Sequence, residues 1–200
     1  MPVEIEAKMA VPDLDIVRAR LRDAGAEHVG LHLEVNTFFD TEDRSLLAAD
    51  EGLRLRRNVN VASGAQEHVV TYKGPRQHGA LKTREEVEVT VGRSEDAVLL
   101  LERLGYVRML AFEKRRDSWR LGACKVELDE LPYLGSYVEV EGPGEAAVLA
   151  VRDQLGLTDR PIVKSSYIAL LMGYLQERGQ TSKVVTFAES GRASPGGLSD

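Results

Sequence analysis

Apolar and charged residues alternate along the chain from its first segment onward. In PVEIEAKMAV (2–11), apolar residues occupy every second position, and Glu4, Glu6 and Lys8 lie between them. A period of two predicts an extended strand with one apolar and one charged face. For a single strand of this kind the charged face usually points to water, so the rest of the chain has to show whether that holds here.

The same patterns divide most of the chain into strands and helices. Strands are predicted at 3–11, 34–40, 51–58, 67–73, 83–91, 110–120, 123–130 and 135–142. Helices are predicted at 13–25, 94–105, 145–156 and 163–178, with a short turn or helical piece near 43–49. Most strands are joined by turns or short connections, which favours an antiparallel sheet of about eight strands with helices packed outside it.

Length and composition indicate one folded domain. The 200 residues, 43% of them hydrophobic, are enough to bury a substantial core. We place this domain at residues 1–178. Residues 179–200 are rich in Ser and Gly, so we expect a flexible C-terminal tail unless contacts hold it.

Charge and cysteine content narrow the choice of partners and compartment. The net charge of −6 argues against general nucleic-acid binding. The single cysteine, Cys124, excludes an intrachain disulfide and fits a reducing compartment. The sequence shows neither a signal-peptide pattern nor an apolar run long enough to span a bilayer. We therefore expect a cytoplasmic protein that binds neither nucleic acid nor membrane.

The polar faces of the predicted strands consist almost entirely of charged residues. The acids are Glu4, Glu6, Glu86, Glu88, Glu127, Asp129, Glu139 and Glu141. The bases are Lys8, Arg54, Arg56, Lys73, Arg84, Lys114, Arg116 and Lys125. A face in contact with water usually mixes uncharged polar residues with charges, and these faces do not.

Two arrangements accommodate such faces. An open antiparallel sheet would expose the charges to water, as in a protein–protein adaptor. Alternatively, the helices cover the apolar face, and the charged face lines the lumen of a closed barrel that holds one small ligand. Buried charges need partners, and acids and bases in equal number supply part of them. We predict the second arrangement: an α+β fold with an eight-stranded antiparallel β-barrel, or tunnel, whose lumen is charged and whose helices pack outside.

The chemistry of the charged residues indicates a ligand. Rows of Arg and Lys suit phosphate oxygens. The paired carboxylates of Glu4 with Glu6 and of Glu139 with Glu141 suit hard cations such as Mg²⁺ or Mn²⁺. Ligands for a cation beside ligands for phosphate suggest a metal–polyphosphate complex, and hence phosphoryl or nucleotidyl transfer.

A series of motifs resembles the CYTH superfamily, the triphosphate tunnel metalloenzymes. The first is E-x-E-x-K at Glu4, Glu6 and Lys8, which is weak by itself. In the family's order follow FFDT (38–41), GLRLR (52–56), TYKGP (71–75), TREEVEV (83–89), EKRRDSW (113–119), VELDELPYLGSYVEVE (126–141) and KSSYIALL (164–171). The resemblance covers roughly residues 2–178 and is greatest to class IV adenylate cyclases and their archaeal-type relatives.

The resemblance implies roles for individual residues. Metal ligands would be Glu4, Glu6 and Glu139, with Glu141 a weaker candidate for Mg²⁺ or Mn²⁺. The triphosphate would be held by Lys8, Arg54, Arg56, Lys73, Arg84, Lys114 and Arg116. The catalytic group would comprise Lys8, Lys114, Arg116 and Asp129, the last binding a second metal or orienting the attacking group. Ser166 and Tyr167 would close the tunnel or pack against it.

Three activities fit these motifs. A class IV adenylate cyclase-like enzyme would convert ATP to cyclic AMP and pyrophosphate, and the overall similarity slightly favours it. A triphosphatase would hydrolyse inorganic triphosphate, thiamine triphosphate or a nucleoside triphosphate. A non-catalytic polyphosphate- or nucleotide-binding module is the third. The expected partner in each case is a triphosphate-containing small molecule, and the resemblance also suggests a homodimer.

Overall fold

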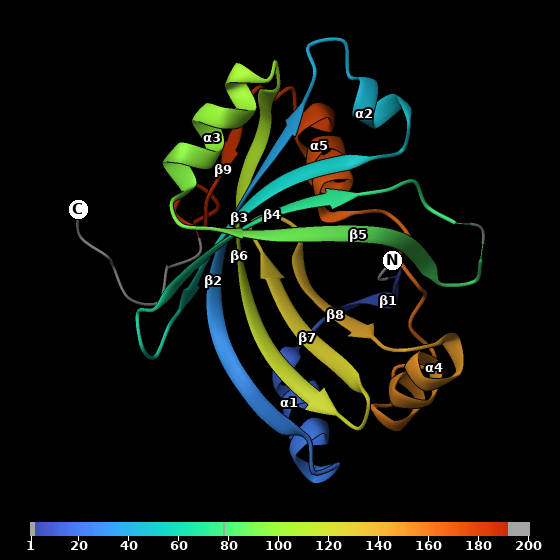
Figure 1. Ribbon diagram of the computed structural model, residues 1–200. Coiled ribbons are helices and arrows are strands. Elements are labelled where there is room, and N and C mark those ends of the chain that lie inside the picture. The colour runs from blue at the N-terminus through green and yellow to red at the C-terminus, as the bar shows by residue number, and fades with distance from the viewer. Residues whose placement is uncertain (1–2, 78, 192–200) are drawn as a thin grey trace.

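The computed structural model of the protein describes residues 3–77 and 79–191 (Figure 1), so the last part of the expected tail, 192–200, lies outside the described residues. The strands are β1 (Val3–Val11), β2 (Glu27–Asp40), β3 (Gly52–Asn60), β4 (Gln66–Lys73), β5 (Lys82–Val91), β6 (Val107–Leu121), β7 (Cys124–Leu131), β8 (Gly135–Glu141) and β9 (Val184–Val185). The helices are α1 (Leu14–Asp23), α2 (Ser45–Ala48), α3 (Ser94–Arg103), α4 (Glu145–Gln154) and α5 (Tyr167–Glu177). None of the helices in this part of the chain is long and apolar enough to cross a membrane.

Strands β1 to β8 form a closed antiparallel barrel. Neighbouring strands follow the order β2-β3-β4-β5-β1-β8-β7-β6, and pairing of β6 with β2 closes the ring. The closing pair is long, running from Glu27 opposite Arg120 to Asp40 opposite Val107. The predicted barrel is thereby confirmed, and the open-sheet alternative is wrong.

Helices cover the outside of the barrel because the apolar faces of the strands point outward (Figure 1). Ala7 and Met9 of β1 share one buried cluster with Val17 and Leu21 of α1 and with Val148 of α4. A second cluster joins α3 to the outer face of β3. Since every second residue of each strand faces these helices, the charged residues between them face the lumen.

The fifth helix has a different position. Leu171 and Leu175 of α5 pack in one cluster with Phe112 of β6 and Tyr137 of β8. Phe112 lies two residues before Lys114, and Tyr137 two residues before Glu139, so both aromatic residues are on the lumen faces of their strands. Phe112 and Tyr167 of α5 also line the cavity described below. Helix α5 therefore covers part of the lumen rather than the outer wall.

Most predicted elements differ from the observed ones by a few residues, but β2 begins at Glu27 rather than at 34. The register with β6 shifts between His28 and Gly30, so the first half of β2 contains a β-bulge. Gly30 has a φ of 156°, a conformation that favours glycine. Pairing with β6 extends the strand through a bulge that the sequence pattern conceals.

The segment after α5 is held against the barrel at several residues. Val184 and Val185 form β9, which pairs in parallel with Ala111 and Phe112 of β6. Phe187 is completely buried, and its backbone N–H donates a hydrogen bond of 2.8 Å to Glu113 Oε2. Within the expected tail, the described residues around β9 are thus tied down.

Candidate active site

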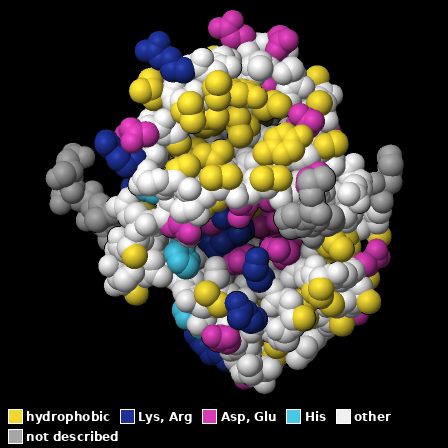
Figure 2. All heavy atoms as spheres, in the orientation of Figure 1, with side chains coloured by type: hydrophobic (Ala, Val, Ile, Leu, Met, Phe, Trp, Pro, Cys, Tyr) yellow, Lys and Arg dark blue, Asp and Glu magenta, His cyan; other side chains and the backbone are white. Residues whose placement is uncertain are grey.

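The lumen of the barrel is a cavity of about 770 Å³. Figure 2 shows it as a hollow in which Lys, Arg, Asp and Glu side chains gather. The predicted site residues that line it are Glu4, Glu6, Lys8, Arg54, Arg56, Lys73, Arg84, Lys114, Arg116, Glu139 and Glu141. Asp129 is fully buried in the adjoining wall. The structure therefore brings together residues from seven strands, β1 and β3 to β8, that the alternation had placed on separate charged faces.

Asp129 anchors the two cations of β6. Its Oδ2 lies 3.3 Å from Lys114 Nζ and 2.6 Å from Arg116 Nη2, and Arg116 Nε donates to its Oδ1 at 2.7 Å. Arg116 Nη2 also lies 2.5 Å from Glu139 Oε2. Burial alone would lower the pKa of Arg116, but the surrounding carboxylates, Asp129 first, raise it well above its usual range. These contacts fix the orientation of the Lys114 and Arg116 side chains.

Glu34 is a central residue of the site that the sequence analysis missed. It is 1% exposed, and its carboxylate lies 3.1 Å from Lys114 Nζ, 3.4 Å from Arg56 Nε and 3.7 Å from Arg116 Nε. Burial alone would raise the pKa of Glu34. The cations, Arg56 first, instead hold this pKa well below its usual range. Its signal was the alternation of Glu34 with Asn36 and Phe38, which runs into the FFDT motif.

Tyr167 joins α5 to the same cluster. Its hydroxyl donates a hydrogen bond of 3.0 Å to Asp129 Oδ2, and Lys8 Nζ lies 4.1 Å from the centre of its ring. Burial, followed by the charge of Asp129, raises the pKa of Tyr167 well above its usual range. Ser166 caps α5 by accepting a hydrogen bond from the Ala169 N–H. Tyr167 thus contacts the charged centre directly, whereas the resemblance implied only closure or packing.

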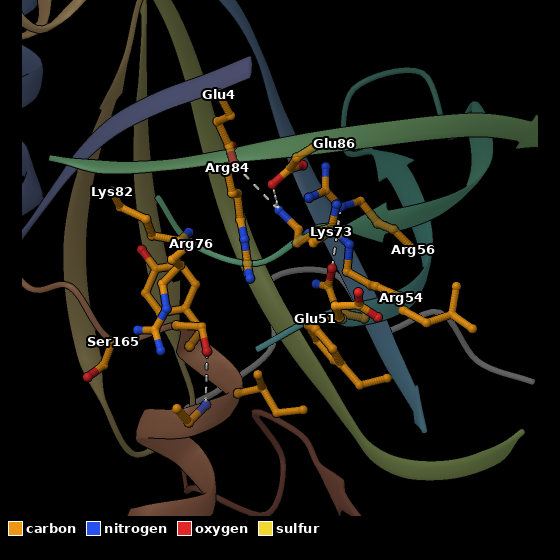
Figure 3. Close-up of a pocket in the computed structure, with 18 of the residues that line it drawn as sticks. Glu4, Glu51, Arg54, Arg56, Lys73, Arg76, Lys82, Arg84, Glu86 and Ser165 are labelled. Carbon is orange, nitrogen blue, oxygen red and sulfur yellow. Dashed lines mark hydrogen bonds and ion pairs between the residues drawn. The ribbon is translucent and has the colours of Figure 1, made fainter. Parts of the chain in front are cut away.

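A second cluster lies on β1, β3, β4 and β5 (Figure 3). Lys73 contacts Glu86 and lies 3.7 Å from Glu4 Oε2. Arg54 Nη2 donates to Thr71 Oγ1 at 3.0 Å, and burial and the neighbouring Arg56 lower the pKa of Arg54 to about 10. The cluster therefore places cations beside carboxylates, as the first cluster does.

Several polar atoms in the cavity wall have no hydrogen-bond partner in the described part of the chain. They include Arg54 Nε, Arg84 Nε and Glu4 Oε2. Arg84 Nη2 donates to the Asp50 carbonyl at 2.6 Å, which directs the side chain along the cavity (Figure 3). Buried donors without acceptors are costly, so an anion with several oxygens would satisfy the guanidinium groups.

The predicted metal ligands offer the oxygen donors that Mg²⁺ and Mn²⁺ prefer. Glu6 lies opposite Glu141 in the register of β1 and β8, and Lys8 opposite Glu139. Burial, followed by the charge of Glu139, raises the pKa of Glu6. The carboxylates are thus close enough to repel one another, and a cation would relieve that repulsion.

These donors are not arranged as a finished metal site. Among residues 3–77 and 79–191, no group of three or more Asp, Glu, His or Cys side chains is placed to hold a metal ion. Each carboxylate instead pairs with a base: Glu6 with Lys82, and Glu139 with Lys8 and Arg116. Lys82 was not predicted, although it lies two residues before Arg84 in the same alternation. The donor chemistry therefore fits a divalent cation, but binding requires these ion pairs to rearrange.

Comparison with known protein families and proteins gives consistent matches. The family model for the CYTH domain matches residues 2–166. The adenylate cyclase CyaB of Aeromonas hydrophila is 29% identical over 177 residues, covering 84% of this chain and 87% of its own. A protein of Methanocaldococcus jannaschii with the provisional name of adenylate cyclase is 27% identical over 139 residues, covering 70% of this chain and 76% of its own.

Solved structures share the fold. The PH1819 protein of Pyrococcus horikoshii superposes with a TM-score of 0.75 at 27% identity, covering 86% of this chain and 99% of its own. HpAC1 of Hippeastrum, which has the provisional name of adenylyl cyclase and is described as showing a dominant triphosphatase activity, superposes with a TM-score of 0.57 at 22% identity, covering 98% of both chains. At that identity the second match supports the fold alone.

Proposed function

We propose that this chain, which belongs to the CYTH domain family, is a divalent-metal-dependent enzyme that binds a triphosphate in the tunnel. The observation that carries the proposal is the enclosed cavity, in which rows of Lys and Arg face carboxylates suited to a hard cation. An anion-binding protein would need the bases alone. Carboxylates among them disfavour an anion unless a metal accompanies it.

The proposed roles follow from the contacts. Lys114 and Arg116 hold phosphate oxygens from one side of the lumen, while Asp129 and Glu34 keep both cations in place. The remaining triphosphate-binding residues would be Lys8, Arg54, Arg56, Lys73 and Arg84. Because these groups are fixed before the substrate arrives, they stabilise the charge that develops in the transition state.

The metal would be held by Glu4, Glu6 and Glu139, with Glu141 as a weaker candidate. When bound, Mg²⁺ or Mn²⁺ would neutralise phosphate charge and polarise the bond that breaks. Glu141 contacts Lys125 at 3.4 Å and is more exposed than the other three residues. We therefore assign it to the margin of the metal site.

The reaction that we favour is the conversion of ATP to cyclic AMP and pyrophosphate, in which the ribose 3′ oxygen attacks the α-phosphorus. The names of the curated relatives support this choice. Hydrolysis of a triphosphate by water is the alternative, and the description of the Hippeastrum protein gives a precedent for it on this fold. The same cations would serve both reactions, because each develops negative charge on phosphate oxygens.

A product assay tests the proposal. Purified protein is incubated with ATP, inorganic triphosphate or thiamine triphosphate, each with Mg²⁺ and with Mn²⁺. Cyclic AMP with pyrophosphate identifies the cyclase, and orthophosphate without a cyclic product identifies the hydrolase. If no triphosphate is turned over although inorganic triphosphate binds, the chain is a non-catalytic binding module.

A carboxylate variant tests the metal site. Glu6→Gln should abolish turnover by removing one charged oxygen ligand while preserving side-chain size. Glu102→Gln is the matched control, since Glu102 is an exposed residue of α3 that pairs with Arg108 outside the tunnel. Full activity of Glu6→Gln with either metal would contradict the assignment, and a thermal melt of each variant confirms that both are folded.

A further inference from the structure

Every predicted metal ligand contacts a cationic side chain within the tunnel. The pairs are Glu4 with Lys73, Glu6 with Lys82, Glu139 with Lys8 and Arg116, and Glu141 with Lys125. Buried carboxylates need such partners, because a buried charge without one is costly. A metal ion that binds these carboxylates must therefore compete with cations of the chain itself.

Lys82 is the most direct of these competitors. It lies on β5 opposite Glu6 of β1, and its Nζ is 2.5 Å from Glu6 Oε1. The side chains of Lys82 and Glu6 are 9% and 6% exposed, so the pair is screened little by water. Lys73 differs, because it is shared between Glu4 and Glu86, and Glu86 is not a predicted metal ligand.

The pair of Lys82 with Glu6 lies among the other predicted ligands. Glu6 faces Glu141 in the register of β1 and β8, Glu4 lies two residues before Glu6 on the same face of β1, and all three line the cavity. The ammonium group of Lys82 therefore occupies space in which a metal ion would meet these carboxylates.

We propose that Lys82 is a resident counter-ion of the Glu6 carboxylate, and that Mg²⁺ or Mn²⁺ binds Glu6 by displacing the ammonium group of Lys82. This inference rests on the proposed function, which names Glu6 as a metal ligand. Two cations at contact distance from Glu6 Oε1 would repel each other strongly, because the site is partly buried. Lys82 therefore lowers the affinity for metal and compensates the charge of Glu6 while no metal is bound.

The displaced ammonium group has a use in the same cavity. Lys82 lines the cavity with the proposed triphosphate-binding residues, and Figure 3 shows its side chain directed toward it. Once released from Glu6, it adds one more donor for phosphate oxygens. Metal and triphosphate should therefore bind with positive coupling, and the coupling is reciprocal.

Calorimetric titration with Mn²⁺ tests the displacement. Lys82→Met removes the charge and should tighten Mn²⁺ binding at least about tenfold, because a competing cation is gone. Lys82→Arg keeps the charge and should bind Mn²⁺ like the parent. Lys183→Met is the matched control, since Lys183 is exposed and its backbone carbonyl, which the substitution keeps, accepts the hydrogen bond from Ala111 of β6. Equal or weaker Mn²⁺ binding by Lys82→Met overturns the inference.

A measurement on the unaltered protein covers the case in which Lys82→Met does not fold. Amine acylation followed by mass spectrometry reports how accessible each lysine is. Saturating Mg²⁺ should increase the labelling of Lys82 several-fold, while exposed Lys183 is labelled equally with and without the ion. Lys82 that stays protected under saturating Mg²⁺ overturns the inference, because the ammonium group has then not left the carboxylates.

The outcomes separate this inference from the proposed function. If the parent binds Mn²⁺ and Lys82→Met binds it no better, only the role of Lys82 is wrong. If Lys82→Met binds Mn²⁺ but the parent does not, the counter-ion role is supported and the metal dependence of the natural protein is wrong. If neither binds Mn²⁺, with or without inorganic triphosphate, both are overturned.

Discussion

Replacing Glu34 with Gln removes one negative charge from the centre of the barrel and leaves the shape of the side chain nearly unchanged. Glu34 is 1% exposed and lies within 4 Å of Lys114, Arg56 and Arg116. The substitution takes the Glu34 carboxylate away from all three cations. Asp129 still compensates the charges of Lys114 and Arg116. Arg56 loses most, because Asn36 is then its remaining hydrogen-bond partner among the described residues.

The size of the effect follows from the geometry. At the 3.1 Å between Glu34 and Lys114, two unit charges attract by about 5 kcal/mol before desolvation is subtracted, with an effective dielectric constant of about 20. Removing one member of a buried pair typically costs about 3–5 kcal/mol, because the other charge stays buried without a partner. The free energy of unfolding of a domain of this kind is about 5–15 kcal/mol. Glu34→Gln should therefore lose about 3–5 kcal/mol of unfolding free energy at pH 7.

Urea denaturation followed by tryptophan fluorescence measures this loss, because Trp119 is the single tryptophan and is buried. Glu102→Gln is the control: its pair with Arg108, at 2.9 Å, is largely exposed, and such pairs contribute about 0–1 kcal/mol. If Glu34→Gln destabilises the protein no more than Glu102→Gln does, the cations do not depend on Glu34 and the reasoning fails.

Acid should remove the difference between the two proteins. The pKa of Glu34 is held well below its usual range in the folded state, mainly by Arg56, Lys114 and Arg116 acting against burial. A depressed carboxyl pKa stabilises the fold above the unfolded-state value of about 4.3 and loses that stabilisation as the pH falls further. The stability gap between parent and Glu34→Gln should therefore be constant near neutrality and shrink below about pH 4.3. A gap that widens on acidification would contradict the depressed pKa.

Two further predictions concern the contacts of Asp129. Lys114→Ala and Arg116→Ala should each weaken binding of inorganic triphosphate by about 2–5 kcal/mol in calorimetry, because each removes a cation from an anion site that is largely shielded from water. Arg108→Ala, outside the tunnel, should bind like the parent. Unchanged binding by both tunnel variants would refute the phosphate assignment. Tyr167→Phe removes the donor to Asp129 Oδ2 and should lower the unfolding free energy, measured by urea denaturation, by about 1–3 kcal/mol. Tyr106→Phe, in the cluster beside α3, is the matched control, and equal stability of the two Tyr variants would argue against the hydrogen bond.

The alternation of residue types was sufficient to predict most strands and the direction of their faces. Glu4, Arg56 and Glu139 lie in one cavity because a period of two leaves a strand residue only two sides to face. The helices outside the barrel followed from the same pattern, since their apolar stripes require an apolar sheet face. Local periodicity was therefore sufficient to predict the fold.

Cross-strand partners were beyond the reach of that pattern. Glu34 forms an ion pair with Lys114, its register partner in β6, although the two are 80 positions apart in the sequence. Lys82 likewise forms an ion pair with its register partner Glu6. Glu34 is the first residue of a predicted strand and Lys82 lies one residue before another, and in both cases the alternation does not identify the partner on the neighbouring strand. The ion-pair network is thus set by the register of the closed barrel, which single-strand patterns do not specify.

The short strand β9 has a practical consequence for anyone who prepares this protein. A version ending at residue 180 would retain α5 and every charged group of the lumen, yet it would lose Val185 and Phe187, both almost fully buried. The backbone N–H and C=O groups of β6 at Ala111 and Phe112 would then lose their pairing with β9. Strand edges with unpaired backbone groups tend to pair with strands of other molecules. We expect such a shortened protein to self-associate during purification even though its chemistry is intact.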